Sequence, residues 1–455
     1  AARCGSASVV AYQRSAGMSV EQGPKFNVSA DRTLINQEGG SVRFIVAEIQ
    51  APKIEAAPSD RHPLNLATVI DASGSMSGMS IAAAKSATVG VIGALEEVDR
   101  LSVVSFATDT VVHCDAVLQN IAGKSLAVAR TGEINTRGST DLASGWFSGC
   151  ECVARVMQDN PNLRNRVIVL SDGHANHGIT DPAILEKHAA ELRTRGIMTS
   201  TIGIGTGYSP TQLQAIAEHG GGRMHDAETP EEIIEIVKAE LEDLSMTVMD
   251  NTEIELVLPA GAVAEPVGSM PFRIEPTGIR AVTGAILSGA TRRVVFKVTL
   301  PRGADNSELH IRASLHWNDP GESNRHRLDH GGVRFNYTDP QRCLHQPRNI
   351  DLSVEIAMIW KMAIVRRTMV LNTDGQFEQA ERYAHNELQW FNRYCRGLPG
   401  VDAHIVELDR MARHAQHRFS PMAAKEVMLA AYKSERGEFD RRSMQRRHWA
   451  DNIPD

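Results

Sequence analysis

Residues 66–75, Leu-Ala-Thr-Val-Ile-Asp-Ala-Ser-Gly-Ser, decide the fold and hold the first candidate site. The apolar run before Asp71 is typical of a strand that is buried on both faces of a sheet. The turn after the run places one carboxylate and two hydroxyls, those of Asp71, Ser73 and Ser75, around a flexible glycine. Hard cations such as Mg²⁺ and Ca²⁺ prefer oxygen ligands. The stretch therefore predicts a buried strand that ends in a cation site.

Two later segments strengthen this prediction, which one short polar pattern could not carry alone. Residues 138–141, Gly-Ser-Thr-Asp, offer the hydroxyl of Thr140 before a helical stretch. Residues 166–173, Arg-Val-Ile-Val-Leu-Ser-Asp-Gly, form a second apolar run that ends at Asp172. Each segment by itself is better explained by helix capping or turn chemistry, but together they favour a site. We expect all three at the carboxyl ends of parallel strands, where open α/β sheets place their ligands.

The combined set resembles the metal-ion-dependent adhesion site of von Willebrand factor type A (VWA) domains in residue types, order and spacing. Its members are Asp71, Ser73, Ser75, Thr140 and Asp172. The resemblance covers roughly residues 64–245. It implies a doubly wound, Rossmann-like sheet that binds Mg²⁺, Ca²⁺ or Mn²⁺ and recognises an Asp or Glu of a partner protein, without catalysis.

The resemblance also implies a division of labour within the site. The three hydroxyls contact the ion, while the two aspartates act mostly through water and hold the other ligands in place. If both aspartates reached the ion directly, they would neutralise its charge and reduce its affinity for a further anion.

Strands and helices alternate through the VWA-like region. The expected strands are 65–71, 101–107, 110–113, 166–171, 198–204 and 223–226, and the expected helices lie near 79–97, 141–157, 182–195, 210–219 and 230–244. The last helix has the clearest start, because Thr229 is an N-cap residue, Pro230 suits the first helical position and Glu232 completes a capping box. This order predicts a parallel sheet covered on both faces, with 110–113 as an antiparallel edge.

Segments on both sides of this region alternate like half-buried strands. They are 26–35, 41–50, 253–258, 271–274, 293–300, 308–317 and 333–337. Two N-terminal strands cannot stand alone. We therefore predict one β-sandwich, built from residues 24–56 and 246–340, into which the VWA domain (64–245) is inserted. The alternative is a separate N-terminal hairpin packed on the parallel sheet.

The C-terminal region, residues 348–440, has helical periodicity. Two of its helices are expected near 401–416 and 421–435, and Trp360, Tyr383 and Trp390 are expected in its core. We expect residues 1–23 to be disordered or extended and residues 441–455 to form a basic, solvated tail.

Composition excludes some functions. The 455 residues suggest roughly two to four domains, and 42% hydrophobic with 23% charged residues is ordinary for a globular protein. A net charge of −7 and a pI of 6.2 argue against a general binder of nucleic acid or anionic membranes. No apolar stretch approaches the roughly 18 residues that span a bilayer, so no transmembrane segment is expected.

The cysteines and the N-terminus indicate a cytoplasmic setting. Six cysteines are scattered over the chain, unlike the dense disulfide framework of a small secreted domain, so we expect free thiols. Cys150 and Cys152 lie two positions apart in an expected helix and hence on different faces, which argues against a redox pair. Residues 1–17 lack the pattern of a secretory signal peptide, and Met18 is a candidate start.

The function predicted from sequence is a non-catalytic, cation-dependent protein-interaction module. An adaptor for a chaperone-like ATPase, which some bacterial VWA proteins resemble, is an alternative within the same class. The other class is a metal-dependent hydrolase in which His174 or His177, beside the proposed ion, supplies acid/base chemistry. A phosphate-binding loop at 123–125 is excluded because Leu118 stands where its first glycine should be. No catalytic residue is assigned.

Overall fold

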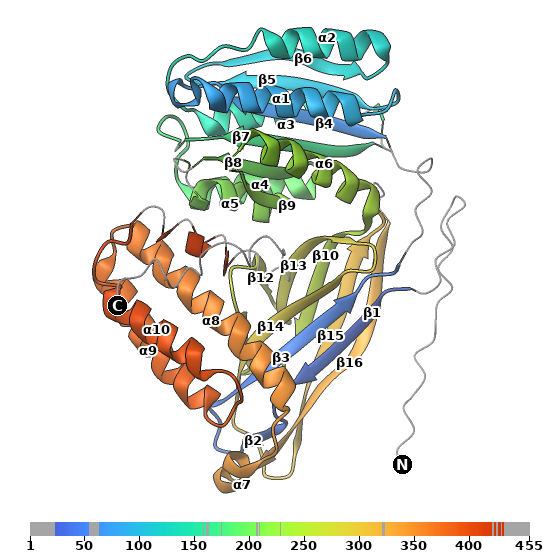
Figure 1. The fold of residues 1–455 in the computed structure, drawn as a ribbon. Helices are drawn as coiled ribbons and strands as arrows, with labels where there is room; N and C mark the ends of the chain where they lie inside the picture. Colours follow the sequence, from blue (N-terminus) through green and yellow to red (C-terminus); the bar gives the residue numbers. More distant parts are fainter. Residues whose placement is uncertain are drawn as a thin grey trace.

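The computed structural model describes residues 23–53 and 63–431, apart from positions 158, 161, 162, 174, 206, 207, 209, 228, 321–323, 421, 422, 425 and 429. Three parts follow one another in space: an α/β domain, a β-sandwich beside it, and a helical arm that covers the sandwich (Figure 1). The predictions for residues 1–22 and for the tail 441–455 fall outside the described residues.

The α/β domain contains a six-stranded sheet. In spatial order its strands are β6 (Thr110–Leu118), β5 (Arg100–Phe106), β4 (Leu64–Asp71), β7 (Arg164–Ser171), β8 (Met198–Ile204) and β9 (Gly221–Ala227). All neighbours run parallel except β5 and β6, which pair antiparallel as predicted. Every residue of β4, β7 and β8 is buried, which explains their near-continuous apolar sequences.

Helices cover both faces of this sheet, so it is doubly wound as predicted. They are α1 (Met79–Ala94), α2 (Ile121–Gly132), α3 (Leu142–Met157), α4 (Pro182–Thr194), α5 (Pro210–His219) and α6 (Pro230–Met246). Leu66 and Ile70 pack in one apolar core with α1 and α6, whereas Ala67 and Val69 pack in a second core with α3, α4 and α5. This alternation follows from the two-residue period of a strand. Thr229 caps α6 by accepting a hydrogen bond from the backbone N–H of Glu232.

Two sheets form the sandwich, and all their strand pairs are antiparallel except β2 with β16, which is parallel. One has the order β1 (Lys25–Ala30), β3 (Ser41–Gln50), β14 (Thr291–Leu300) and β11 (Val263–Pro266). The other has the order β12 (Phe272–Glu275), β13 (Gly278–Leu287), β10 (Thr247–Val257), β15 (Glu308–Asn318), β16 (Arg325–Thr338) and β2 (Leu34–Asn36). Strand β3 pairs with β14 from Ser41 opposite Leu300 to Gln50 opposite Thr291. The predicted insertion of the α/β domain into a sandwich is therefore confirmed, and the separate N-terminal hairpin is excluded.

The helical arm contains α7 (Pro340–His345), α8 (Ile350–Thr373), α9 (Phe377–Cys395) and α10 (Asp402–His414). Helix α8 packs on the outer face of the smaller sheet, where the rings of Phe44 and Trp360 lie 5.2 Å apart. Trp390 is 59% exposed, so its predicted core position is wrong: it lies next to Phe391, which occupies the buried face of α9. The predicted helix 421–435 extends beyond the described residues.

Other differences from the predicted elements have local causes. The expected strand 26–35 is two strands, because Asp31 leaves β1 to accept a hydrogen bond from the backbone N–H of Phe44, and β2 then crosses to pair with β16. Helix α2 and strands β11 and β13 were not predicted. Among the described residues, no helix combines the length and the apolar character that a bilayer crossing requires.

Candidate metal centre

The first segment of the site leaves the carboxyl end of β4. Asp71 is buried as the last residue of this strand, and Oδ1 of its carboxylate accepts a hydrogen bond of 2.9 Å from the backbone N–H of Ser73. Such a bond to the backbone two residues on is common for Asp in turns. The 3-10 helix η1 (Gly74–Met76) then buries Met76 and leaves Ser75 exposed. This tight turn holds both serines close to the carboxylate.

Asp172 meets these serines from the next strand of the sheet. It directly follows β7, which runs parallel to β4, so the two carboxyl ends share one edge. The hydroxyl of Ser75 donates a hydrogen bond of 2.8 Å to Oδ1 of Asp172 and lies 3.0 Å from Oγ of Ser73. Since the proton of Ser75 points at Asp172, lone pairs of its oxygen remain for another partner.

Thr140 reaches the same edge by a different route from the one predicted. It does not follow a strand, because helix α2 lies between β6 and the loop that carries Thr140. Backbone hydrogen bonds hold this loop against the ends of β4 and β5: Arg137 N–H donates to Ala72 C=O at 2.6 Å, and Asp141 N–H donates to Ala107 C=O at 2.9 Å. Thr140 is 4% exposed, so it lies below the surface at this edge of the sheet.

Gly173 shows that the three segments border one space. A Cβ atom on Gly173 would lie 3.5 Å from both Ser75 Oγ and Thr140 Oγ1, and 3.9 Å from Asp71 Oδ2. Oxygens of the first two segments thus face a position that the glycine of the third segment leaves open. The five residues offer only carboxylate and hydroxyl oxygens, and the described residues contain no group of three or more His, Cys, Asp or Glu placed to hold a metal. This donor set fits a hard cation such as Mg²⁺ rather than a soft one.

Electrostatics favour a cation beside the two aspartates. Burial raises the pKa of Asp71 above its ordinary value, although hydrogen bonds from Ser171 and Ser73 act in the opposite direction. Burial and the nearby charge of Asp71 raise the pKa of Asp172, and the hydrogen bond from Ser75 opposes this rise. Burial therefore destabilises the ionised carboxylates, and a bound cation would offset that cost.

Ser171 is a site residue that the sequence analysis did not single out. Its hydroxyl donates a hydrogen bond of 2.6 Å to Oδ2 of Asp71, the oxygen that the Ser73 N–H does not use. The signal was present, because Ser171 directly precedes Asp172 in the quoted strand. His177 contributes its backbone N–H to Thr140 C=O at 3.3 Å, and its side chain is exposed. His174 lies outside the described residues.

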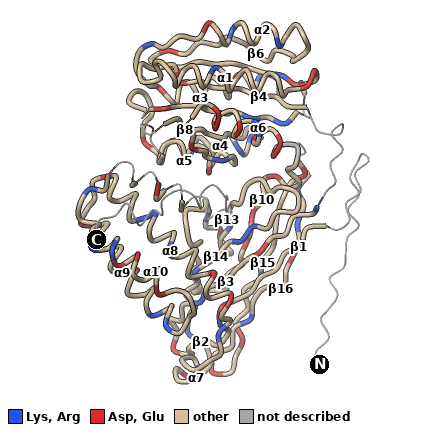
Figure 2. Tube along the Cα trace, in the orientation of Figure 1, with Lys and Arg blue, Asp and Glu red and all other residues tan. Residues whose placement is uncertain are grey.

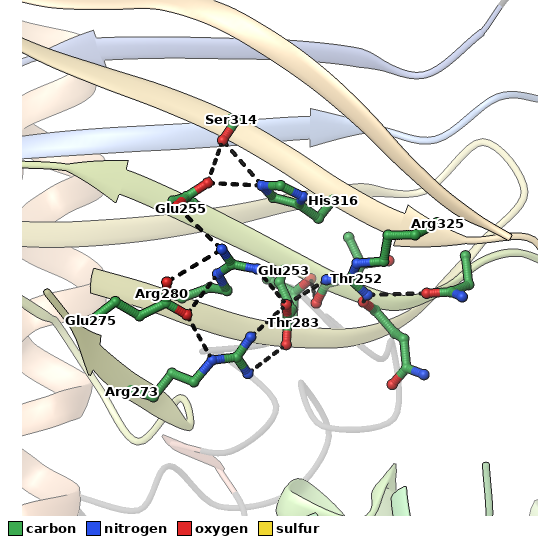
Figure 3. Close-up of polar contacts among 12 residues, drawn as sticks. Thr252, Glu253, Glu255, Arg273, Glu275, Arg280, Thr283, Ser314, His316 and Arg325 are labelled. Carbon is green, nitrogen blue, oxygen red and sulfur yellow. Dashed lines mark hydrogen bonds and ion pairs between the residues drawn. The ribbon is translucent and has the colours of Figure 1, made fainter. Parts of the chain in front are cut away.

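A second polar cluster lies on the outer face of the larger sandwich sheet (Figure 3). Ser314, His316 and Glu255 contact one another there, beside Arg280. The same His316 atom, Nε2, lies 3.1 Å from the Ser314 hydroxyl and 2.9 Å from Glu255. A nucleophile relay needs the serine on one ring nitrogen and the carboxylate on the other. With Ser314 only 2% exposed, this cluster is a buried structural network.

Comparison with known families identifies the α/β domain. A family model of the von Willebrand factor type A domain matches residues 65–239. The uncharacterized protein sll0103 of Synechocystis sp. is 30% identical over 224 residues, which is 47% of this chain and 51% of that protein. The chain therefore spans about half the length of this curated relative.

Two solved structures share the fold of nearly the whole chain. The von Willebrand factor type A structure from Catenulispora acidiphila has a TM-score of 0.66 and 17% identity, and the match covers 90% of this chain and 97% of that one. The ArnB paralog VWA2 from Sulfolobus acidocaldarius has a TM-score of 0.57 and 14% identity, with 92% and 99% covered. The sandwich and the helical arm thus accompany a VWA domain in these structures as well.

Proposed function

Because residues 65–239 form a von Willebrand factor type A domain, we propose that this chain is a divalent-cation-dependent protein-interaction module. In this proposal Mg²⁺, Ca²⁺ or Mn²⁺ binds at the metal centre, which consists of Asp71, Ser73, Ser75, Thr140 and Asp172. The observation that carries the proposal is the convergence of Ser75, Thr140 and Asp71 on the space beside Gly173.

The hydrogen bonds of the metal centre support distinct roles for its residues. Ser75 and Thr140 would offer hydroxyl oxygens to the ion. Asp172 orients the Ser75 hydroxyl, and the buried carboxylate of Asp71 is fixed by Ser73 and Ser171. Neutral oxygens next to the ion preserve more of its positive charge than direct carboxylate ligands would. When bound, the ion supplies an electrophilic position for a carboxylate oxygen of a partner.

The proposed partner is a protein that presents Asp or Glu, rather than a nucleic acid. Support comes from the net charge of −7. Basic and acidic positions are also interspersed through all three parts of the chain (Figure 2), whereas a nucleic-acid binder gathers its basic residues on one face. The proposed setting is cytoplasmic, supported by the free thiols of Cys114, Cys150, Cys152, Cys343 and Cys395.

We propose no catalytic step for the module. The hydrolase alternative depended on acid/base chemistry from His174 or His177. The described contact of His177 with the metal centre is made by its backbone N–H, not by its imidazole. No specific contact favours the ATPase-adaptor alternative either.

The decisive experiment is affinity capture of partners with and without EDTA, combined with calorimetric Mg²⁺ titration. The wild type is compared with the double variant Ser73→Ala/Ser75→Ala, which removes two hydroxyls of the centre. We expect the wild type to bind Mg²⁺ and to retain acidic partners only without EDTA, and the double variant to do neither. The matched control is Ser125→Ala, because Ser125 is an exposed helical serine bonded to Ile121 C=O. Capture that is equal in EDTA and Mg²⁺ would refute the proposal.

A further inference from the structure

Asn176 joins the Asp172 loop to Thr140, and it bonds to both backbone polar groups of Thr140. The backbone N–H of Thr140 donates a hydrogen bond of 3.1 Å to Oδ1 of Asn176. In return, the backbone N–H of Asn176 donates to Thr140 C=O at 3.1 Å. Thr140 is almost fully buried whereas Asn176 is exposed, so the loop brings a polar side chain from the surface to a buried N–H.

Close packing keeps this contact in place. Gly178 has a φ of 69°, and a Cβ there would lie 2.5 Å from Oδ1 of Asp141. Only glycine tolerates both this backbone conformation and this approach. The Asp172 loop is thereby seated directly on residues 140 and 141.

Gln212 holds the same loop from helix α5. Its Oε1 accepts a hydrogen bond of 3.0 Å from the backbone N–H of Ala175, and its Nε2 donates to Thr180 C=O at 2.9 Å. Gln212 is 7% exposed, so both ends of its amide act inside the domain. The loop between Asp172 and α4 is thus fixed on both sides of Asn176.

Thr140 needs such support more than the other ligands of the metal centre. Asp71 and Asp172 lie at or directly after strand ends and inherit their positions from the sheet. Thr140 lies in a loop after α2, and the direction of its hydroxyl follows from the backbone at that residue. A fixed backbone is therefore the condition for Oγ1 to face the space beside Gly173.

We infer that Asn176 is a positioning residue of the metal centre: it holds the backbone of Thr140 so that Oγ1 faces the same space as Ser75, and Gln212 holds the loop that carries Asn176. This inference rests on the proposed cation binding. Asn176 itself contacts Thr140 and is not assigned as an ion ligand.

The test uses two readouts on the full chain, and the first needs no ion. In EDTA, hydrogen exchange at the Thr140 amide should be faster in Asn176→Ala than in the wild type, because the acceptor is lost. Asn176→Asp keeps an acceptor oxygen at this position and should restore protection. Because no ion is present in EDTA, the negative charge of Asp cannot act by attracting Mg²⁺. The exchange rate of the Thr140 amide therefore reports only whether an acceptor is present.

The second readout is calorimetric titration with Mg²⁺ alone. Asn176→Ala should weaken Mg²⁺ binding by about tenfold, the equivalent of one lost buried hydrogen bond. Asn135→Ala is the matched control, because the Asn135 side chain is exposed and bonds only to Glu133 C=O among the contacts described. Melting curves establish that each variant is folded.

The outcomes separate this inference from the proposed function. A wild type that binds no Mg²⁺ overturns both. If the wild type binds and Asn176→Ala binds equally well, the inference alone falls. It falls as well if Mg²⁺ affinity drops while Thr140 protection stays at the wild-type level, because the effect would then not pass through Thr140.

Discussion

The hydroxyl of Ser75 donates a 2.8 Å hydrogen bond to Oδ1 of Asp172, a residue 97 positions later in the chain. This bond joins the turn after β4 to the turn after β7 at the edge where the two parallel strands end together. It also fixes which way the Ser75 lone pairs point. A surface serine without this partner would rotate freely, so the bond prepares an oxygen ligand before any ion arrives.

The ion should stabilise the protein. Binding to the folded state alone contributes about 2.7 kcal/mol at an ion concentration a hundredfold above Kd. For a domain of this size that corresponds to a rise in Tm of roughly 5–10 °C. Thermal unfolding in EDTA, Mg²⁺, Ca²⁺ and Mn²⁺ measures the effect. Equal Tm values in all four conditions would count against a metal centre, and Ser73→Ala/Ser75→Ala should abolish the rise.

Glu240 makes the α/β domain sensitive to acid. It is 7% exposed and accepts hydrogen bonds from Ser200 at 2.6 Å and His225 at 2.7 Å. Burial alone would raise its pKa, but His225, the charge of Arg223 and the hydrogen bond from Ser200 together outweigh burial and lower the pKa to about 2. A lowered pKa contributes stability above the unfolded value of 4.5, and this contribution is lost as the pH falls through that value toward 2.

We therefore expect the free energy of unfolding of the wild type to fall steeply in this acid range. Glu240→Gln cannot ionise, so the variant should be less stable near neutral pH and should lose less stability on acidification. Chemical denaturation across a pH series measures both curves. Glu231→Gln serves as control, because Glu231 is an exposed carboxylate of the same helix. Parallel curves for the wild type and Glu240→Gln would contradict the assignment.

The parts of the fold that could be predicted are those that the pattern of apolar residues along the chain determines. Strands β4, β7 and β8 are buried on both faces, so their sequences are apolar throughout and their ends are marked by Asp71, Asp172 and a glycine. Helix α2 was missed because it presents Ile121 and Leu126 to solvent, which masks its amphipathic pattern. Strand β13 was missed because glycine at 278 and 284 interrupts its alternation.

For the candidate site, the residues that form it could be predicted from the sequence, but the contacts that support Thr140 could not. Residue types and spacing pointed to all five proposed ligands, and the structure places Ser73, Ser75 and Asp172 in one hydrogen-bonded chain with Thr140 and Asp71 facing the same space. The support of Thr140 could not be predicted, because its bond to Asn176 joins residues 36 positions apart and depends on how a loop is seated. Sequence patterns report periodicity and not loop-to-loop contacts.

Two single substitutions should separate ion binding from partner binding. Asp71→Ala removes the buried carboxylate, so it should abolish both Mg²⁺ binding and cation-dependent partner capture. Thr140→Ala removes one of the hydroxyls that contact the ion in the partner-binding form proposed for the centre. It should weaken partner binding by about 10- to 100-fold and Mg²⁺ binding less. Both variants should remain folded, because each change lies at the rim of the sheet and outside the two apolar cores.

Calorimetric titration and EDTA-sensitive capture measure these effects. Thr136→Ala is the control, because the Thr136 hydroxyl lies on the same loop but contacts Ser77 Oγ at 3.2 Å rather than a proposed ligand. If both variants keep a cation-dependent partner at wild-type affinity, the partner does not bind through the ion. The binding surface should then be sought on the sandwich or the helical arm.

Gly173 offers a test that removes no ligand at all. The Cβ of Gly173→Ala would lie 3.5 Å from Ser75 Oγ and Thr140 Oγ1, an ordinary van der Waals distance, so the fold should accept it with a change in unfolding free energy within about 0.5 kcal/mol. The methyl group would nevertheless occupy space that the ion and its water need. Mg²⁺ affinity should therefore fall by about tenfold or more, while Tm in EDTA stays at the wild-type value.

Gly93→Ala is the matched control, because a Cβ at Gly93 meets no atom within 4 Å. If Gly173→Ala binds Mg²⁺ with wild-type affinity, the ion does not bind in the space beside Gly173. An ion in that space would lose affinity when a methyl group enters it.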